Sequence, residues 1–165
     1  MMRNRRKVLD VLEQYGARYE ILEHEPMYTV EDIEKANLWN HRDGTGAKNL
    51  FLRDGSGKHH FLVVIKEDKQ ADLKIVRKEI QSSRLSFASG ERLMKYLGVS
   101  PGSVSPFGIL NDRERQVSVF FDKDLKDYEY LAVHPNDNRA TIWMKTELMV
   151  QIIKDHGNFF DWITI

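Results

Sequence analysis

The sequence contains no cysteine, which excludes disulfides, thiolate metal sites and a cysteine nucleophile. It carries no excess charge, because 25 lysine and arginine residues balance 25 aspartate and glutamate residues. A neutral chain is poorly suited to coating DNA or long RNA through charge, although a small footprint at one RNA end stays compatible. No apolar run reaches the length of a membrane span, and no signal-peptide core follows the basic residues 3–7. We therefore expect a cytoplasmic protein without membrane contact.

Several motifs of known chemistry are also missing. The segment around Lys48 does not match a phosphate-binding loop, because Ala47 precedes the lysine, Asn49 follows it and a strand comes next. There is no Gly-x-Ser-x-Gly nucleophile elbow and no His-Glu-x-x-His zinc motif. The six histidines show no metal-site spacing with a third ligand nearby. We therefore expect no nucleotide hydrolysis, no serine nucleophile and no metal or other cofactor.

The 165 residues, 41% of them hydrophobic, suit one globular domain that spans 1–165. Apolar spacing and capping residues predict helices near residues 8–15, 30–37, 73–80, 90–97 and 146–156, capped where possible by Thr29, Asp72, Ser89 and Thr146. Alternation predicts strands at 18–22, 49–53, 59–65, 84–88, 116–121, 128–133 and 139–145, with irregular segments at 39–46 and 99–108. Several links between strands are too short for parallel crossovers. The pattern favours an α/β (α+β) fold with a mixed, largely antiparallel sheet flanked by helices.

Lys48 is the first candidate for a functional residue. The glycine-rich residues 44–47 precede it, and glycine lets the backbone approach a ligand closely. The apolar residues 50–52 follow it, and an apolar wall strengthens any contact between an ammonium and an anion or a carbonyl oxygen. A plain surface lysine at a strand end is the alternative.

Two further candidates lie in the second half of the chain. The loop of residues 102–108 holds two glycines and a proline, so its backbone amides and carbonyls could orient a water molecule or bind an oxyanion. Simple turn chemistry explains the same composition. His134 ends a predicted strand before Pro135, where it either caps the turn or donates to a substrate carbonyl or ribose hydroxyl.

Together these segments resemble the YbaK/ProRS-associated family of aminoacyl-tRNA editing domains, and within it the freestanding ProX-type branch. The matching pieces follow the family's order and cover nearly the whole chain: residues 24–26 with 29–31, 48–53, 85–88, 97–112, and His134-Pro135 with Asn138 and Thr141. The resemblance implies a compact α/β editing domain that hydrolyses the ester of mischarged tRNA, most simply alanyl-tRNA for proline. Its partners would be the acceptor end of the tRNA and possibly prolyl-tRNA synthetase, with the oligomeric state open.

The resemblance also implies roles for individual residues. Lys48 would be essential and bind the RNA terminus or the substrate, the loop at Gly102 would position the hydrolytic water and the aminoacyl carbonyl, and His134 would contribute to size selection. The remaining substrate-binding residues would be Met27, Tyr28, Thr29, Asn49, Ser103, Ser105 and Pro106. Two alternatives stay open: the same reaction on cysteinyl-, seryl- or threonyl-tRNA, or a non-catalytic module that senses an amino acid or a charged tRNA.

Overall fold

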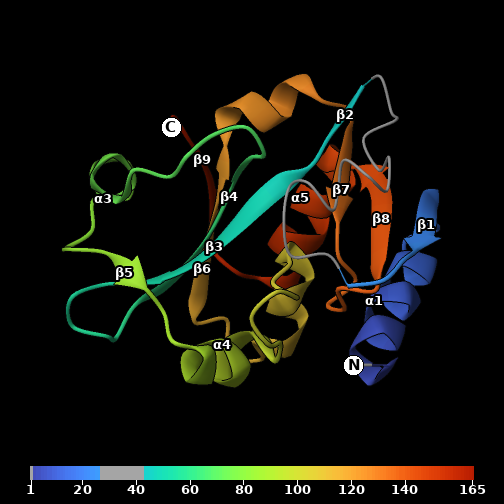
Figure 1. The fold of residues 1–165 in the computed structure, drawn as a ribbon, viewed down its shortest axis with the longest axis horizontal. Coiled ribbons are helices and arrows are strands. Elements are labelled where there is room, and N and C mark those ends of the chain that lie inside the picture. Colours follow the sequence, from blue (N-terminus) through green and yellow to red (C-terminus); the bar gives the residue numbers. More distant parts are fainter. Residues whose placement is uncertain (1, 27–42) are drawn as a thin grey trace.

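The computed structural model describes residues 2–26 and 43–165 (Figure 1). The helices are α1 (Met2–Gln14), α3 (Leu73–Ile80), α4 (Gly90–Leu97) and α5 (Thr146–His156), with two 3₁₀ helices, η1 (Pro106–Asn111) and η2 (Lys123–Asp127). The strands are β1 (Tyr19–Glu23), β2 (Gly44–Thr45), β3 (Ala47–Arg53), β4 (His60–Lys66), β5 (Ser86–Phe87), β6 (Val117–Asp122), β7 (Tyr130–Val133), β8 (Ala140–Lys145) and β9 (Phe160–Ile163). No helix in these described ranges is long and apolar enough to span a membrane.

The strands form two mixed sheets. One sheet has the order β1-β8-β7-β2, and the other has the order β5-β3-β4-β6-β9. The β3–β4 hairpin is antiparallel, with Lys48 opposite Ile65, whereas β6 and β9 extend the same sheet in parallel. The predicted α/β fold class is confirmed. The expectation of one sheet is corrected, because the strands divide between two sheets, and the pairing partners lie too far apart in the chain for local patterns to reveal this.

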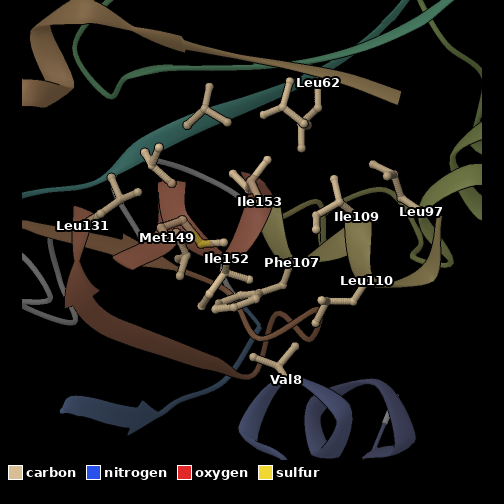
Figure 2. Packing of buried hydrophobic residues seen from close by; sticks show 14 of the residues in the cluster. Val8, Leu62, Leu97, Phe107, Ile109, Leu110, Leu131, Met149, Ile152 and Ile153 are labelled. Atoms are coloured by element: carbon tan, nitrogen blue, oxygen red, sulfur yellow. The ribbon is translucent and has the colours of Figure 1, made fainter. Parts of the chain in front are cut away.

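The main core lies between the two sheets. Apolar side chains from α1, α4, η1 and α5 meet side chains of β4 and β7 there, and Figure 2 shows Val8, Leu97, Phe107 and Met149 converging from four of these elements. A second, smaller core covers the opposite face of the five-stranded sheet, where Leu52, Val63 and Ile65 pack with Val76 of α3. Strand alternation produces this division, since successive side chains point to opposite faces.

Local signals located most helix ends correctly. The Asp72 side chain accepts a hydrogen bond from the backbone N–H of Lys74, and Ser89 accepts one from Arg92, so both are the helix caps that the sequence predicts. Gly98 ends α4 with φ +65°. The predicted helix over 30–37, with its Thr29 cap, and residues 39–42 of the predicted loop lie outside the described residues.

The prediction that Thr146 caps the last helix is wrong. Lys145 occupies the cap position without a side-chain bond, and Thr146 is the first helical residue. The reason is that the Thr146 N–H still donates to the Glu129 carbonyl at 2.9 Å, which keeps the strand ladder going to the helix start. The Thr146 hydroxyl is buried, and no residue in the described ranges is its hydrogen-bond partner.

Three short elements also differ from the prediction. The segment 99–108 is not irregular throughout, because η1 begins at Pro106, with the Ser105 hydroxyl accepting from the Phe107 N–H. Serine at the cap followed by proline at the first position is a helix-start signal. The two residues of β2 pair with β7 inside the predicted loop, and β9 pairs with β6 although no strand was predicted there.

Candidate functional site

His134 leaves the end of β7 and turns back toward the start of β8. Its ring Nδ1 lies 3.0 Å from the Ala140 carbonyl oxygen. Because a carbonyl only accepts hydrogen bonds, Nδ1 carries the proton and donates it. The neutral ring then keeps a lone pair on Nε2, for which no partner is found in the described part of the chain. His134 therefore offers an acceptor nitrogen in a fixed orientation.

Burial lowers the pKa of His134, because desolvation penalises the charged ring. The hydrogen bond to Ala140 and the carboxylate of Asp137 oppose this shift, while His24 adds to it. The net lowering of the pKa favours the neutral ring, in which Nε2 is an acceptor.

A second histidine, His24, lies against the same end of β8. Its backbone N–H donates to the Arg139 carbonyl at 2.9 Å. Its ring contacts the Glu25 carbonyl through Nδ1 and the Thr141 hydroxyl through Nε2, both at 2.8 Å. Thr141 is only 5% exposed, so this hydroxyl is held in a largely dry environment.

The turn after His134 is clamped from two sides. Asp137 accepts from the Arg139 N–H at 3.0 Å and is paired with Arg5 of α1 at 3.1 Å. The side-chain Nδ2 of Asn136 donates to the Phe107 carbonyl at 3.2 Å, which joins this turn to η1. Asn136 has φ +58°, and its buried Oδ1 finds no hydrogen-bond partner among the described residues. The structure thus brings the His134 turn together with the end of the candidate loop.

The candidate loop is itself held rigidly. Gly102 is exposed with φ +92°, a conformation that favours glycine, and the Ser103 N–H donates to the Ser100 carbonyl. Ser105 is fully buried, and its hydroxyl caps η1. Pro106 is buried at the first turn of the same helix. Ser105 and Pro106 therefore shape the loop, and their predicted contact with substrate stays a prediction.

The side chain of Lys48 bonds with a different part of the molecule from the His134 turn. Its Nζ donates to the Lys69 carbonyl at 2.6 Å, on the face of β3 that also bears Leu50 and Leu52 and packs toward α3. The Lys69 ammonium is in turn paired with Asp122 at 2.9 Å. In the described ranges no hydrogen bond joins Lys48 to His134 or to the 102–108 loop.

Asn49 points to the opposite face of β3, toward the main core, and its Oδ1 is a buried acceptor for which the described residues provide no partner. A buried amide oxygen without such a partner is unusual in proteins. Met27, Tyr28 and Thr29 lie outside the described residues. Where the structure describes the chain, no three His, Asp or Glu side chains gather as metal ligands would.

Known proteins resemble this chain over nearly its whole length. Residues 24–152 match the family model described as the aminoacyl-tRNA editing domain. The chain belongs to this family. It is 46% identical over 153 residues to the prolyl-tRNA editing protein ProX of Acetoanaerobium sticklandii, covering 93% of this chain and 92% of that protein. It is 30% identical to the prolyl-tRNA synthetase associated domain-containing protein 1 of Xenopus laevis, again covering 93% and 92%.

The fold of this editing domain also matches solved structures. One, of a protein proposed as a trans-editing enzyme for prolyl tRNA synthetase, has a TM-score of 0.72 at 20% identity and covers 98% of this chain and 97% of that chain. At this identity the match shows a shared fold. The family expected from the sequence is confirmed.

Three residues near His134 were not predicted to be functional. His24 and Thr141 were only parts of matching motifs, and Asn136 was only a turn residue. The sequence held one usable signal for His24, its position three residues before the predicted pocket residue Met27. Nothing local links it to Thr141, because the two meet only when β1 pairs with β8.

Proposed function

We propose that this editing domain is a trans-editing deacylase that hydrolyses the ester of mischarged tRNA, with alanyl-tRNA for proline as its substrate. The observation that carries the proposal is the 46% identity, over 93% of the chain, to a protein named for prolyl-tRNA editing. The geometry of the His134 turn and the 102–108 loop agrees with this reaction, as follows.

The reaction needs no covalent intermediate with the protein. Water adds to the carbonyl carbon of the aminoacyl ester, the carbon–oxygen bond to the ribose breaks, and the ribose oxygen leaves with a proton. An ester of this kind is activated, so placing the water and stabilising the oxyanion suffice without a covalent intermediate. This fits a chain with no cysteine and no serine nucleophile motif.

In this proposal the loop from Gly102 supplies backbone groups that orient the water and the carbonyl. The neutral His134 accepts a hydrogen bond through Nε2 and forms a wall that limits the size of the amino acid. Lys48 holds the RNA terminus or the substrate through its ammonium. The rigid fixing of the loop by Ser105 and of the turn by Asn136 supports the roles of the loop and of His134, since catalysis by positioning fails when the groups move.

Energetics explain why such an enzyme is needed. A synthetase pocket shaped for proline cannot strongly reject the smaller alanine, because missing methylene groups give only about 1–3 kcal/mol of discrimination. A second site that admits alanine and excludes proline removes the error. The acceptor end of the tRNA is then the main partner, docking on prolyl-tRNA synthetase is a further one, and the cytoplasm is the place of action.

The direct test is deacylation of alanyl-tRNA for proline, with prolyl-tRNA as the control substrate. Lys48→Ala should reduce turnover by about 10²-fold or more, as expected for loss of an electrostatic contact to the reacting groups. Lys74→Ala is the matched control, because Lys74 is an exposed lysine on α3, and it should leave turnover unchanged.

Each result decides a part of the proposal. Loss of alanine only, abolished by Lys48→Ala, supports the function and the role of the lysine. Hydrolysis of cysteinyl-, seryl- or threonyl-tRNA in place of alanyl-tRNA would overturn the substrate assignment. Absence of all hydrolysis would overturn the enzyme assignment in favour of a sensing module.

A further inference from the structure

Two histidines approach the same end of β8 from opposite sides. In the four-stranded sheet β8 lies between β1 and β7, and His24 extends β1 while His134 extends β7. His24 is bound to Arg139 and Thr141, and His134 is bound to Ala140. Three successive residues of one chain segment thus hold both histidines: Ala140 and Thr141 contact the imidazoles, and Arg139 contacts the backbone of His24.

The hydrogen bonds of the His24 ring determine which atom of each pair donates. Its Nδ1 faces the Glu25 carbonyl and therefore carries the proton. In the neutral ring Nε2 must then accept, so the Thr141 hydroxyl donates to it. The oxygen of Thr141 keeps its remaining lone pair for a donor on the other side.

Thr141 adjoins the residue that holds His134. The pairing of β7 with β8 ends with Val133 opposite Ile142, and the ring of the next residue, His134, is held by the Ala140 carbonyl. Thr141 follows Ala140 in β8, and its hydroxyl contacts His24. The Thr141 hydroxyl therefore belongs to the segment of β8 that holds both histidines.

We propose that His24 is a positioning residue of the deacylation site: it orients the Thr141 hydroxyl and lies close enough to His134 for its charge to act on that ring. This inference rests on the proposed function. When His24 is protonated, its Nε2 becomes a donor, so the Thr141 hydroxyl has to turn its proton away from His24. The same positive charge disfavours a second positive charge on His134.

The other charged groups that the described residues place around the pair are carboxylates and guanidinium groups. Asp137, in the same turn, favours the charged form of His134, but Arg5 of α1 pairs with it at 3.1 Å. Arg5 also pairs with Glu23 at the end of β1, at 2.6 Å. Arg139, between the histidines along β8, is exposed. Among the described groups around His134, His24 is the other imidazole.

The first experiment follows the histidine rings directly by NMR. Protein labelled with ¹⁵N-histidine is titrated from pH 5 to 8, with His134 assigned from the spectrum of a His134→Gln variant. In wild type the ring of His134 should show the Nδ1–H tautomer. In His24→Gln its titration midpoint should move to higher pH, because a competing positive charge is gone. An unchanged midpoint would overturn the electrostatic part of the proposal.

The second experiment uses turnover and a matched pair of variants. Thr141→Val removes the hydroxyl at nearly constant volume and should lower kcat by about tenfold or more, with little change in KM, since it disturbs orientation. Thr141→Ser keeps the hydroxyl and should restore the rate. Equal rates for Thr141→Val and wild type would overturn the positioning role.

The two experiments separate this proposal from the proposed function. The NMR titration needs no substrate, so it judges the coupling of the histidines even if the protein hydrolyses no aminoacyl-tRNA. If hydrolysis occurs, the acid limb of the kcat/KM profile should shift to higher pH in His24→Gln, in step with the His134 midpoint. If His24→Gln unfolds, His24→Asn, titrated in the same way, replaces it, and the thermal midpoint of each variant verifies folding.

Discussion

Replacing Gly98 by alanine tests how the candidate loop is anchored, and Gly16 offers a matched control. Both glycines end a helix with a positive φ, +65° at Gly98 and +60° at Gly16. A Cβ at Gly16 would meet nothing within 4 Å. A Cβ at Gly98 would lie 2.8 Å from the Nδ2 of Asn111. The two substitutions therefore share the backbone penalty and differ only in the collision.

The magnitude follows from the contacts of Asn111. An L-residue in this left-handed conformation costs roughly 1–2 kcal/mol at either position. At Gly98 the Asn111 side chain must also move, and it bonds with Leu97 at 2.9 Å, Lys7 at 3.0 Å and Asn4 at 3.2 Å. Each such bond contributes about 0.5–1.5 kcal/mol, so losing two or three adds roughly 1–4.5 kcal/mol. We expect Gly98→Ala to destabilise clearly more than Gly16→Ala.

Urea unfolding of both variants measures the difference, with an unchanged m-value as the condition for comparing them. Gly98 and Asn111 also bracket the 102–108 loop, so Gly98→Ala should reduce deacylation at temperatures where the protein is still folded, whereas Gly16→Ala should not. Equal loss of stability in the two variants would refute the role given to Asn111. Full activity of Gly98→Ala would refute the link between this anchor and the loop.

Three further changes test other contacts of the fold. Tyr15→Phe removes the 2.6 Å hydrogen bond to Asp155 that joins the segment after α1 to α5, and because the bond is exposed the variant should lose about 0.5 kcal/mol in urea unfolding. The same bond raises the pKa of Tyr15 to about 12, so an absorbance titration should lose one late-ionising phenol in the variant. Burial and, to a smaller extent, the nearby Arg92 lower the pKa of His60, so the unfolded chain takes up the proton more readily than the folded one. The free energy of unfolding should therefore fall as the pH drops below about 6.5. His60→Gln should weaken this fall, and an unchanged dependence on pH would contradict the role given to His60. Asp112→Ala removes the acceptor of the Val117 N–H in β6 and of the Asn158 side-chain amide before β9. The free energy of unfolding should fall by about 2–5 kcal/mol, and Asp112→Asn should lose less. Thermal and urea unfolding measure both losses.

Sequence patterns predicted the parts of the fold that depend on neighbouring residues. Asp72 and Ser89 cap their helices because a side chain reaches an N–H two or three residues away, whatever the rest of the chain does. The β3–β4 hairpin follows from turn residues 54–57 between two apolar runs, and Gly57 there has φ +73°. These signals are local, so one sequence contains them fully.

Elements that depend on distant partners were missed for the opposite reason. The two residues of β2 become a strand only because β7 lies alongside, and β9 is four residues long, too short to distinguish by alternation. Threonine is a common helix cap, but the hydrogen bond from the Thr146 N–H to the Glu129 carbonyl makes Thr146 the first helical residue. Such choices are made by tertiary contacts, which local patterns do not record.

The candidate site also contains features that the sequence predicted and features that depend on distant parts of the chain. Lys48, the loop and His134 were named from local composition and family resemblance, and the structure joins the loop to the His134 turn through Asn136 and Phe107. Their chemical roles stay predictions. The environment of His134 could not be predicted, because its burial and its neighbour His24 arise from strands far apart in the sequence.

Residues that keep the His134 turn in place matter more to the proposed site than reactive side chains do. A reaction carried by a positioned water needs an acceptor at a fixed place, and His134 provides one only while its turn stays in place. Arg5 holds that turn from α1 by pairing with Asp137, whose side chain is 3% exposed, so cutting this pair leaves a buried charge alone. Arg5→Met should therefore reduce deacylation although Arg5 has no proposed contact with substrate, and full activity in a folded Arg5→Met protein would contradict a mechanism based on positioning.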